Sequence, residues 1–73
     1  MGDISSEAIA DAKVLAKKIS MEDYMSIKRF WERRDYAFIA VILRRYGLDF
    51  KGVTYLEMLI DELMREKEQK KVG

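Results

Sequence analysis

Apolar residues recur at helical spacing near the start of the chain, whereas the lysines of this stretch lie off the apolar positions. The apolar stripe consists of Ala8, Ile9, Ala12, Leu15, Ala16 and Ile19. This spacing predicts an amphipathic helix with one face toward a core. Ser5 is placed to cap the helix, and Ile4 and Ile9 occupy the positions of a hydrophobic staple.

Four successive charged residues, Glu32 to Asp35, interrupt the next apolar pattern. Ser20 precedes that pattern, and Asp23 follows three residues later in an arrangement like a capping box. The charged run spans more than one helical turn, so no apolar stripe passes through it. We therefore expect a helix break, with Asp35 capping a third helix. A single helix over 21–46 is the alternative, because neither Gly nor Pro forces the break.

The segment 36–46 is apolar on nearly every side. A helix of this kind is normally covered on most sides by other parts of a protein. Arg44 and Arg45, followed by Gly47, are typical of a helix C-terminus, because cations suit the macrodipole and Gly suits the left-handed position after the cap. We interpret the segment as a helix, since the sequence offers no second strand with which it could pair.

A loop over 47–53 leads to the last predicted helix, and Phe50 within it is expected to turn inward. Thr54 begins a sequence with the form of a capping box, and Val53 and Met58 take the staple positions. The helix is expected to run from Tyr55 to about Lys70. The tail, about 68–73, is expected to fray.

The composition restricts the fold class to an all-α protein. The chain has 73 residues and a mass of 8.6 kDa, with 49% hydrophobic and 37% charged residues, no Pro and four Gly. These values predict one all-helical domain over 1–73, a small bundle of about four helices, or three if the middle two are continuous.

Catalytic and metal chemistry have few candidate residues. The chain has no Cys and no His, which removes disulfides, a thiol nucleophile and the most common general base. Ser26 therefore has no base to activate it. Glu57 and Asp61 share a helix face and are candidates for holding Mg²⁺, but a solvated face with ion pairs is the preferred interpretation. We expect a non-catalytic protein with no cofactor.

Self-association is expected from the amount of apolar surface. A domain of this size buries only about 60% of the surface of its unfolded chain, and the third helix needs more cover than short neighbours supply. We therefore predict a small helical interaction, adaptor or regulatory module that forms a homo-oligomer, with a dimer favoured, or docks on another protein. The predicted protein interface consists of Tyr55, Leu56, Met58, Leu59, Ile60 and Leu63.

The charge distribution supports an alternative function. Net charge is only +1, but six basic and two acidic residues lie within 28–45. Arginine forks suit phosphate, and Trp31 and Tyr36 could stack on bases, so a small nucleic-acid-binding regulator is the alternative. The same cations could instead solvate helix ends. The candidate residues for an anionic partner are Lys28, Arg29, Arg33, Arg34, Arg44 and Arg45.

A secretory signal is not recognisable in this sequence. Ser6 matches the short myristoylation pattern that begins at Met1-Gly2, but no basic cluster lies nearby to supply a second membrane signal. The first residues are acidic rather than basic, and the longest apolar run, 36–43, is much shorter than the roughly 20 residues that a membrane span needs. We therefore expect no membrane association and a cytoplasmic location.

Overall fold

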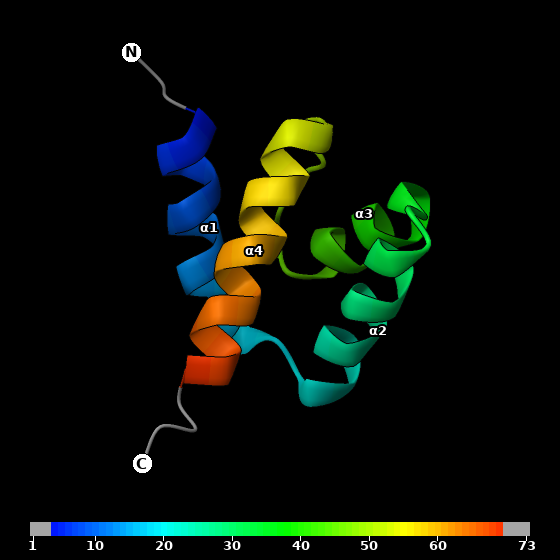
Figure 1. The fold of residues 1–73 in the computed structure, drawn as a ribbon, viewed down its shortest axis with the longest axis horizontal. Coiled ribbons are helices and arrows are strands. Elements are labelled where there is room, and N and C mark those ends of the chain that lie inside the picture. The colour runs from blue at the N-terminus through cyan, green and yellow to red at the C-terminus, as the bar shows by residue number, and fades with distance from the viewer. Residues whose placement is uncertain (1–3, 70–73) are drawn as a thin grey trace.

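Four helices account for most of the part of the chain that the structure describes, residues 4–69. In this computed structural model they are α1 Ile4–Lys18, α2 Met21–Glu32, α3 Tyr36–Arg45 and α4 Val53–Gln69 (Figure 1). The predicted all-α fold is confirmed. The middle two helices are separate, as the charged run between them predicts.

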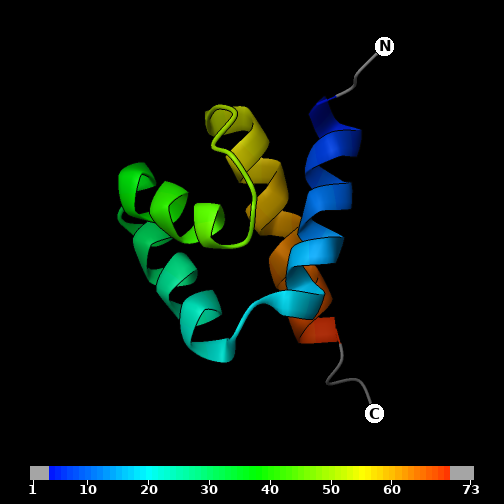
Figure 2. The same cartoon turned by 180° about the vertical axis from the view of Figure 1, so that it is seen from behind.

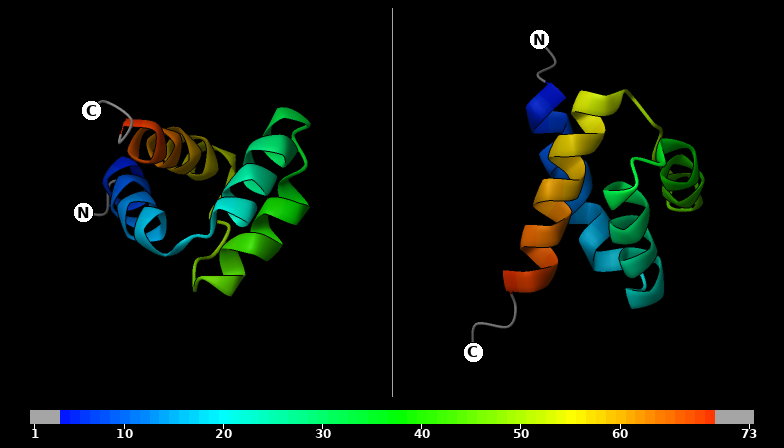
Figure 3. Two further views of the ribbon diagram at one scale, coloured as in Figure 1. Left: turned by 90° about the horizontal axis from the view of Figure 1, so that it is seen from below. Right: turned by 45° about the vertical axis from the view of Figure 1, so that its right-hand side comes forward.

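The helices form two pairs. α1 and α4 lie side by side and run in the same direction, although α2 and α3 come between them in the sequence (Figure 1). α2 and α3 form an antiparallel hairpin that packs beside this pair (Figure 2). Seen from below, the two pairs form two layers (Figure 3).

The core lies where the two layers meet. Ala8 and Ala12 of α1 are completely buried. The Cα radius of gyration is 11.5 Å, close to the value of about 11 Å that is typical of a compact domain of this length. The remaining buried apolar residues are Leu15, Ile19, Tyr24, Ile27, Ile39, Ile42, Leu43, Tyr55, Leu56, Leu59, Ile60 and Leu63.

Polar contacts set the register of α1 against α4. The hydroxyl of Tyr55 donates a hydrogen bond to Oδ2 of Asp11 at 2.6 Å. Burial, together with this bond, raises the pKa of Tyr55 above its ordinary value. Further along both helices, Nζ of Lys13 lies 3.0 Å from Oε2 of Glu66 and 3.6 Å from Oε2 of Glu62. The contacts advance in the same direction along both helices, as a parallel pair requires.

α2 begins and ends with recognisable hydrogen bonds. Oγ of Ser20 accepts a bond from the backbone N–H of Asp23 at 3.1 Å, which confirms the predicted cap. At the other end, the N–H of Asp35 donates to the carbonyl of Phe30, and the N–H of Arg34 donates to that of Trp31. This is the Schellman arrangement, and its left-handed position is normally Gly. Here it is Arg34, with φ +58°.

α3 ends in the same arrangement with the expected residue. Gly47 has φ +82°. Its N–H donates to the carbonyl of Arg44, and the N–H of Leu48 donates to that of Leu43, both at 3.0 Å. At the start of α3, Asp35 occupies the cap position, but its side chain accepts no capping hydrogen bond. The predicted Asp35 cap is therefore correct in position only.

Two predicted N-terminal caps are wrong. α1 begins at Ile4, so Ser5 lies inside its first turn. α4 begins at Val53, so Thr54 also lies inside the helix instead of preceding it. The carbonyl of Gly52, whose φ is +122°, accepts the bond from the N–H of Leu56. The chain enters α4 through this glycine, and the capping box is not used.

The end of α4 lies close to the predicted position, about Lys70. The helix continues through Gln69, and Oε2 of Glu68 accepts hydrogen bonds from the Tyr24 hydroxyl at 2.9 Å and from Nζ of Lys28 at 3.0 Å. The helix thus extends into the first two positions of the predicted tail, and fraying there stays a prediction. The rest of the predicted tail, 70–73, lies outside the described residues.

The expected inward turn of Phe50 is also wrong. Its side chain is 40% exposed, and its ring stacks against Tyr36 with the centroids 6.4 Å apart. The loop therefore lies against the start of α3 without burying this ring.

Candidate functional site

The apolar stripe of α4 belongs to the core and is not a surface. Five of the six residues predicted as a protein interface are at most 1% exposed, and the sixth, Met58, is half-buried. α1 packs along α4 and covers much of this face. The chain's own helices thus occupy the place assigned to a partner, so the predicted interface is corrected here. The five core residues are Tyr55, Leu56, Leu59, Ile60 and Leu63.

The outer side of α3 is where apolar surface stays exposed. Phe38 is 54% exposed and Val41 is 53% exposed, one turn apart on this helix. Phe38 stacks on Phe30 of α2, with the ring centroids 4.9 Å apart. Ile39 and Leu43, on the opposite side of α3, are completely buried. The expectation that α3 is covered on most sides therefore holds for its inner side alone.

Other large apolar side chains are exposed elsewhere on the chain. Single exposed apolar residues are common on soluble domains. Val14 of α1, at 52% exposed, has nearly the same exposure as Val41. The remaining ones are Ile4, Ile9, Met21, Met25, Phe50 and Val53.

The six basic residues considered for an anionic partner do not form one patch. Lys28 pairs with Glu68 at 3.0 Å, and Arg45 pairs with Asp23 at 3.5 Å. Arg33 and Arg34 lie at the turn before α3, whereas Arg44 and Arg45 lie at the C-terminal end of α3. Within residues 4–69, four of the six are exposed and form no ion pair: Arg29, Arg33, Arg34 and Arg44. Of these, Arg34 lies over the ring of Trp31.

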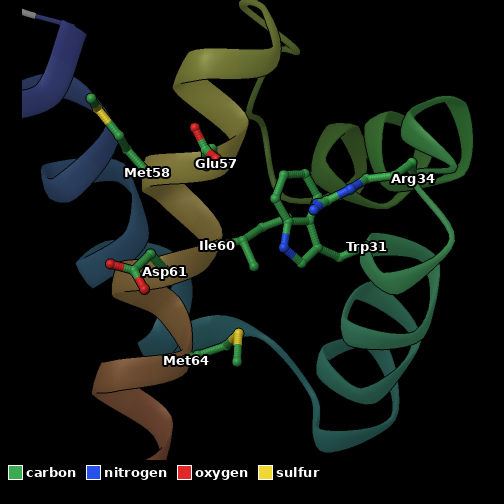
Figure 4. Close-up of a pocket in the computed structure, with 7 residues that line it drawn as sticks. All are labelled: Trp31, Arg34, Glu57, Met58, Ile60, Asp61 and Met64. Atoms are coloured by element: carbon green, nitrogen blue, oxygen red, sulfur yellow. The ribbon is translucent and has the colours of Figure 1, made fainter.

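A groove lies between the end of α2 and α4 (Figure 4). It has a volume of about 540 Å³. The guanidinium of Arg34 lies over the indole of Trp31, with Cζ 4.3 Å from the ring centroid, and Ile60 points toward the indole from α4. The other lining residues are Glu57, Met58, Asp61 and Met64.

Two carboxylates stand on the α4 side of the groove. Glu57 and Asp61 are one turn apart and exposed. Asp61 pairs with Arg65 at 3.3 Å, as the i,i+4 spacing predicts, and Glu57 forms no ion pair within the described residues. No group of three or more His, Cys, Asp or Glu in residues 4–69 is placed to hold a metal ion, so the Mg²⁺ alternative gains no support.

The groove combines residues that the sequence presented separately. Trp31 and Arg34 stood out for nucleic-acid contact, and Glu57 and Asp61 for a metal. The structure brings the end of α2 against α4 and places all four around one groove. No sequence signal indicates this, because the contact depends on how the α2–α3 hairpin packs on the α1–α4 pair.

Comparisons of the chain with protein-family models, with curated proteins and with solved structures found no match. Within the described residues, none of the helices combines the length and the apolar character that crossing a membrane requires. The proposed function therefore rests on the surfaces of the chain.

Proposed function

We propose that the chain is a small non-catalytic helical interaction module that self-associates through the outer side of α3. The exposure of Phe38 and Val41 carries this proposal, because each is more than half exposed on the most apolar helix of the fold. Full burial of an exposed side chain of this kind contributes roughly 1.5 to 3 kcal/mol, and burying the exposed half of each contributes about half as much. The cytoplasm is the proposed location.

A second copy of the chain is the proposed partner, because the apolar residues on the outer side of α3 can meet the same residues of the copy. A two-fold interface places the same surface on both copies. When α3 meets its copy in antiparallel orientation, Phe38 faces Val41 of the other copy. Apolar contact therefore favours this register.

Sedimentation velocity over a wide concentration range tests self-association. We expect the mass of the wild-type chain to rise with concentration, and Val41→Glu to remain a single chain, because it would place a carboxylate in the interface. Val14→Glu is the matched control, since it makes the same change at nearly the same exposure on α1. A wild-type chain that stays single throughout, or equal effects of the two variants, would contradict the proposal.

A small nucleic-acid-binding regulator is the second candidate. The exposed and unpaired Arg29, Arg33 and Arg44 favour it. Phosphate contacts would make the affinity for DNA or RNA fall steeply with salt. Alanine at Arg33, Arg34, Arg44 and Arg45 should then abolish binding. Binding that survives these substitutions would contradict this candidate.

A further inference from the structure

The groove between α2 and α4 has two walls of different character. The indole of Trp31 lies on the α2 side, and Ile60 of α4 points toward it (Figure 4). The α4 side also carries the carboxylates of Glu57 and Asp61. An aromatic face beside carboxylates attracts a cation that also has a flat or apolar part.

Arg34 shows which chemical group suits the aromatic wall. Its guanidinium lies on the Trp31 indole at 4.3 Å. The backbone that delivers it has φ +58°, a conformation that residues with a Cβ adopt rarely. The side chain of Arg34 lies against Trp31, and Arg34 forms no ion pair with Glu57 or Asp61 across the groove. The guanidinium therefore covers the indole, while Glu57 forms no ion pair within residues 4–69 and Asp61 pairs with Arg65 of its own helix.

We propose that this groove binds an arginine side chain of a partner polypeptide, and that Arg34 occupies the indole face in the free chain. The incoming guanidinium stacks on Trp31 in place of Arg34 and pairs with Glu57 and Asp61. Met58 and Met64 supply adaptable apolar contacts for the residues beside it. The site is formed by α2 and α4, so it is independent of self-association through α3.

Charge excludes the opposite ligand. An anionic group facing Arg34 would also face Glu57 and Asp61, which repel it. Arginine is favoured over lysine because its planar guanidinium both stacks on an indole and forms forked hydrogen bonds with carboxylates.

Tryptophan fluorescence reports on this groove directly, because Trp31 is the only Trp in the sequence. The probe is a capped tetra-arginine peptide, and tetra-lysine and tetra-glutamate peptides are its comparisons. We expect saturable binding of the arginine peptide, weaker binding of the lysine peptide and none of the glutamate peptide. Equal binding of the arginine and lysine peptides, or binding of the glutamate peptide, would overturn the proposal.

Neutralising Glu57 and Asp61 tests whether their charges contribute to binding of the arginine peptide. The double variant Glu57→Gln/Asp61→Asn should bind the arginine peptide roughly fivefold more weakly, the loss that two exposed ion pairs permit. The control Glu22→Gln/Asp49→Asn makes the same change of charge at exposed positions outside the groove. An equal loss in both variants would show general attraction to the chain and would overturn the site.

The substitution Arg34→Gly tests whether Arg34 competes with the ligand for the indole, because competition predicts a gain in affinity. Removing the internal guanidinium should strengthen binding of the arginine peptide by about threefold, since the peptide no longer competes for the indole. Weaker binding by this variant would mean that Arg34 contributes to the ligand site, and would refute its role as an internal occupant. Circular dichroism establishes that each variant keeps its helices.

Discussion

Arg33 and Arg34 are neighbours at the end of α2 with opposite backbone requirements. Arg33 has φ −90°, which any residue adopts, whereas Arg34 has φ +58°. Substituting each by Ala and by Gly therefore compares two arginines on the same helix end. We expect Gly to be more stable than Ala at position 34, and Ala to be more stable than Gly at position 33.

The magnitude follows from two opposing contributions. A residue with a Cβ in the left-handed region costs about 1 to 2 kcal/mol relative to Gly. Gly loses more conformational entropy on folding, which costs about 0.4 to 1 kcal/mol relative to Ala. At position 34 the cost of the strained backbone exceeds the entropy cost of Gly. The free energy of unfolding of the Gly variant should therefore exceed that of the Ala variant by about 0.5 to 1 kcal/mol. At position 33 the entropy contribution acts alone, and the order reverses by a similar amount.

The wild type provides the third comparison. Its guanidinium lies on Trp31, and a contact of this kind at an exposed site contributes about 0.5 to 1 kcal/mol. Arg34→Ala loses this contact and keeps the strained backbone, so we expect it to be the least stable of the three. Arg34→Gly loses the contact and relieves the strain, and its free energy of unfolding should stay close to that of the wild type.

Urea denaturation followed by helical circular dichroism measures these differences. At a protein concentration where the chain is single, the midpoint reports the change in free energy directly if the slope is unchanged. The same order of Gly and Ala at both positions would refute the assignment of backbone strain to Arg34. Arg34→Ala as stable as wild type would refute a contribution from the stacked guanidinium.

Further predictions concern local features of the fold. Gly47→Ala should destabilise the chain by about 1 kcal/mol through backbone strain alone, because a Cβ there meets no atom within 4 Å, and thermal denaturation measures it. Ser20→Ala should cost about 1 kcal/mol, whereas Thr54→Ala should cost much less because Thr54 caps no helix; urea midpoints compare the two. Burial and the hydrogen bond to Glu68 raise the pKa of Tyr24 from 10.0 to about 12. Its stabilising contribution is therefore complete below pH 10 and is lost as pH rises through about 12, and Tyr24→Phe should flatten the measured decrease in stability over that range.

Signals that act over a few residues were readable from the sequence. The Ser20 cap and the Gly47 terminus are both confirmed, because each depends on hydrogen bonds within one or two turns. The Thr54 capping box has an equally clear pattern but is not used. Gly52, two residues earlier, adopts φ +122° and lets the helix begin at Val53. Equivalent local signals thus compete, and the backbone freedom of a nearby glycine decides the outcome.

Contacts between distant segments were not readable. The stripe of α4 has the same pattern whether its partner is α1 or a second copy, so periodicity identified Leu59 and Leu63 as buried without identifying what buries them. Likewise, nothing in the sequence places Trp31 against Ile60. The exposed side of α3 was not predictable either. A helix that is apolar on most sides gives no sequence signal for which side faces water.

The parallel pairing of α1 and α4 has a consequence for how the chain acquires its fold. The α2–α3 hairpin closes over a short turn, so it can form early. α1 can dock on α4 only after Val53–Gln69 has been synthesised, since its partner surface does not exist before then. During translation Ala8, Ala12 and Leu15 therefore stay in contact with water or a chaperone. The core is completed when the last turns of α4 leave the ribosome.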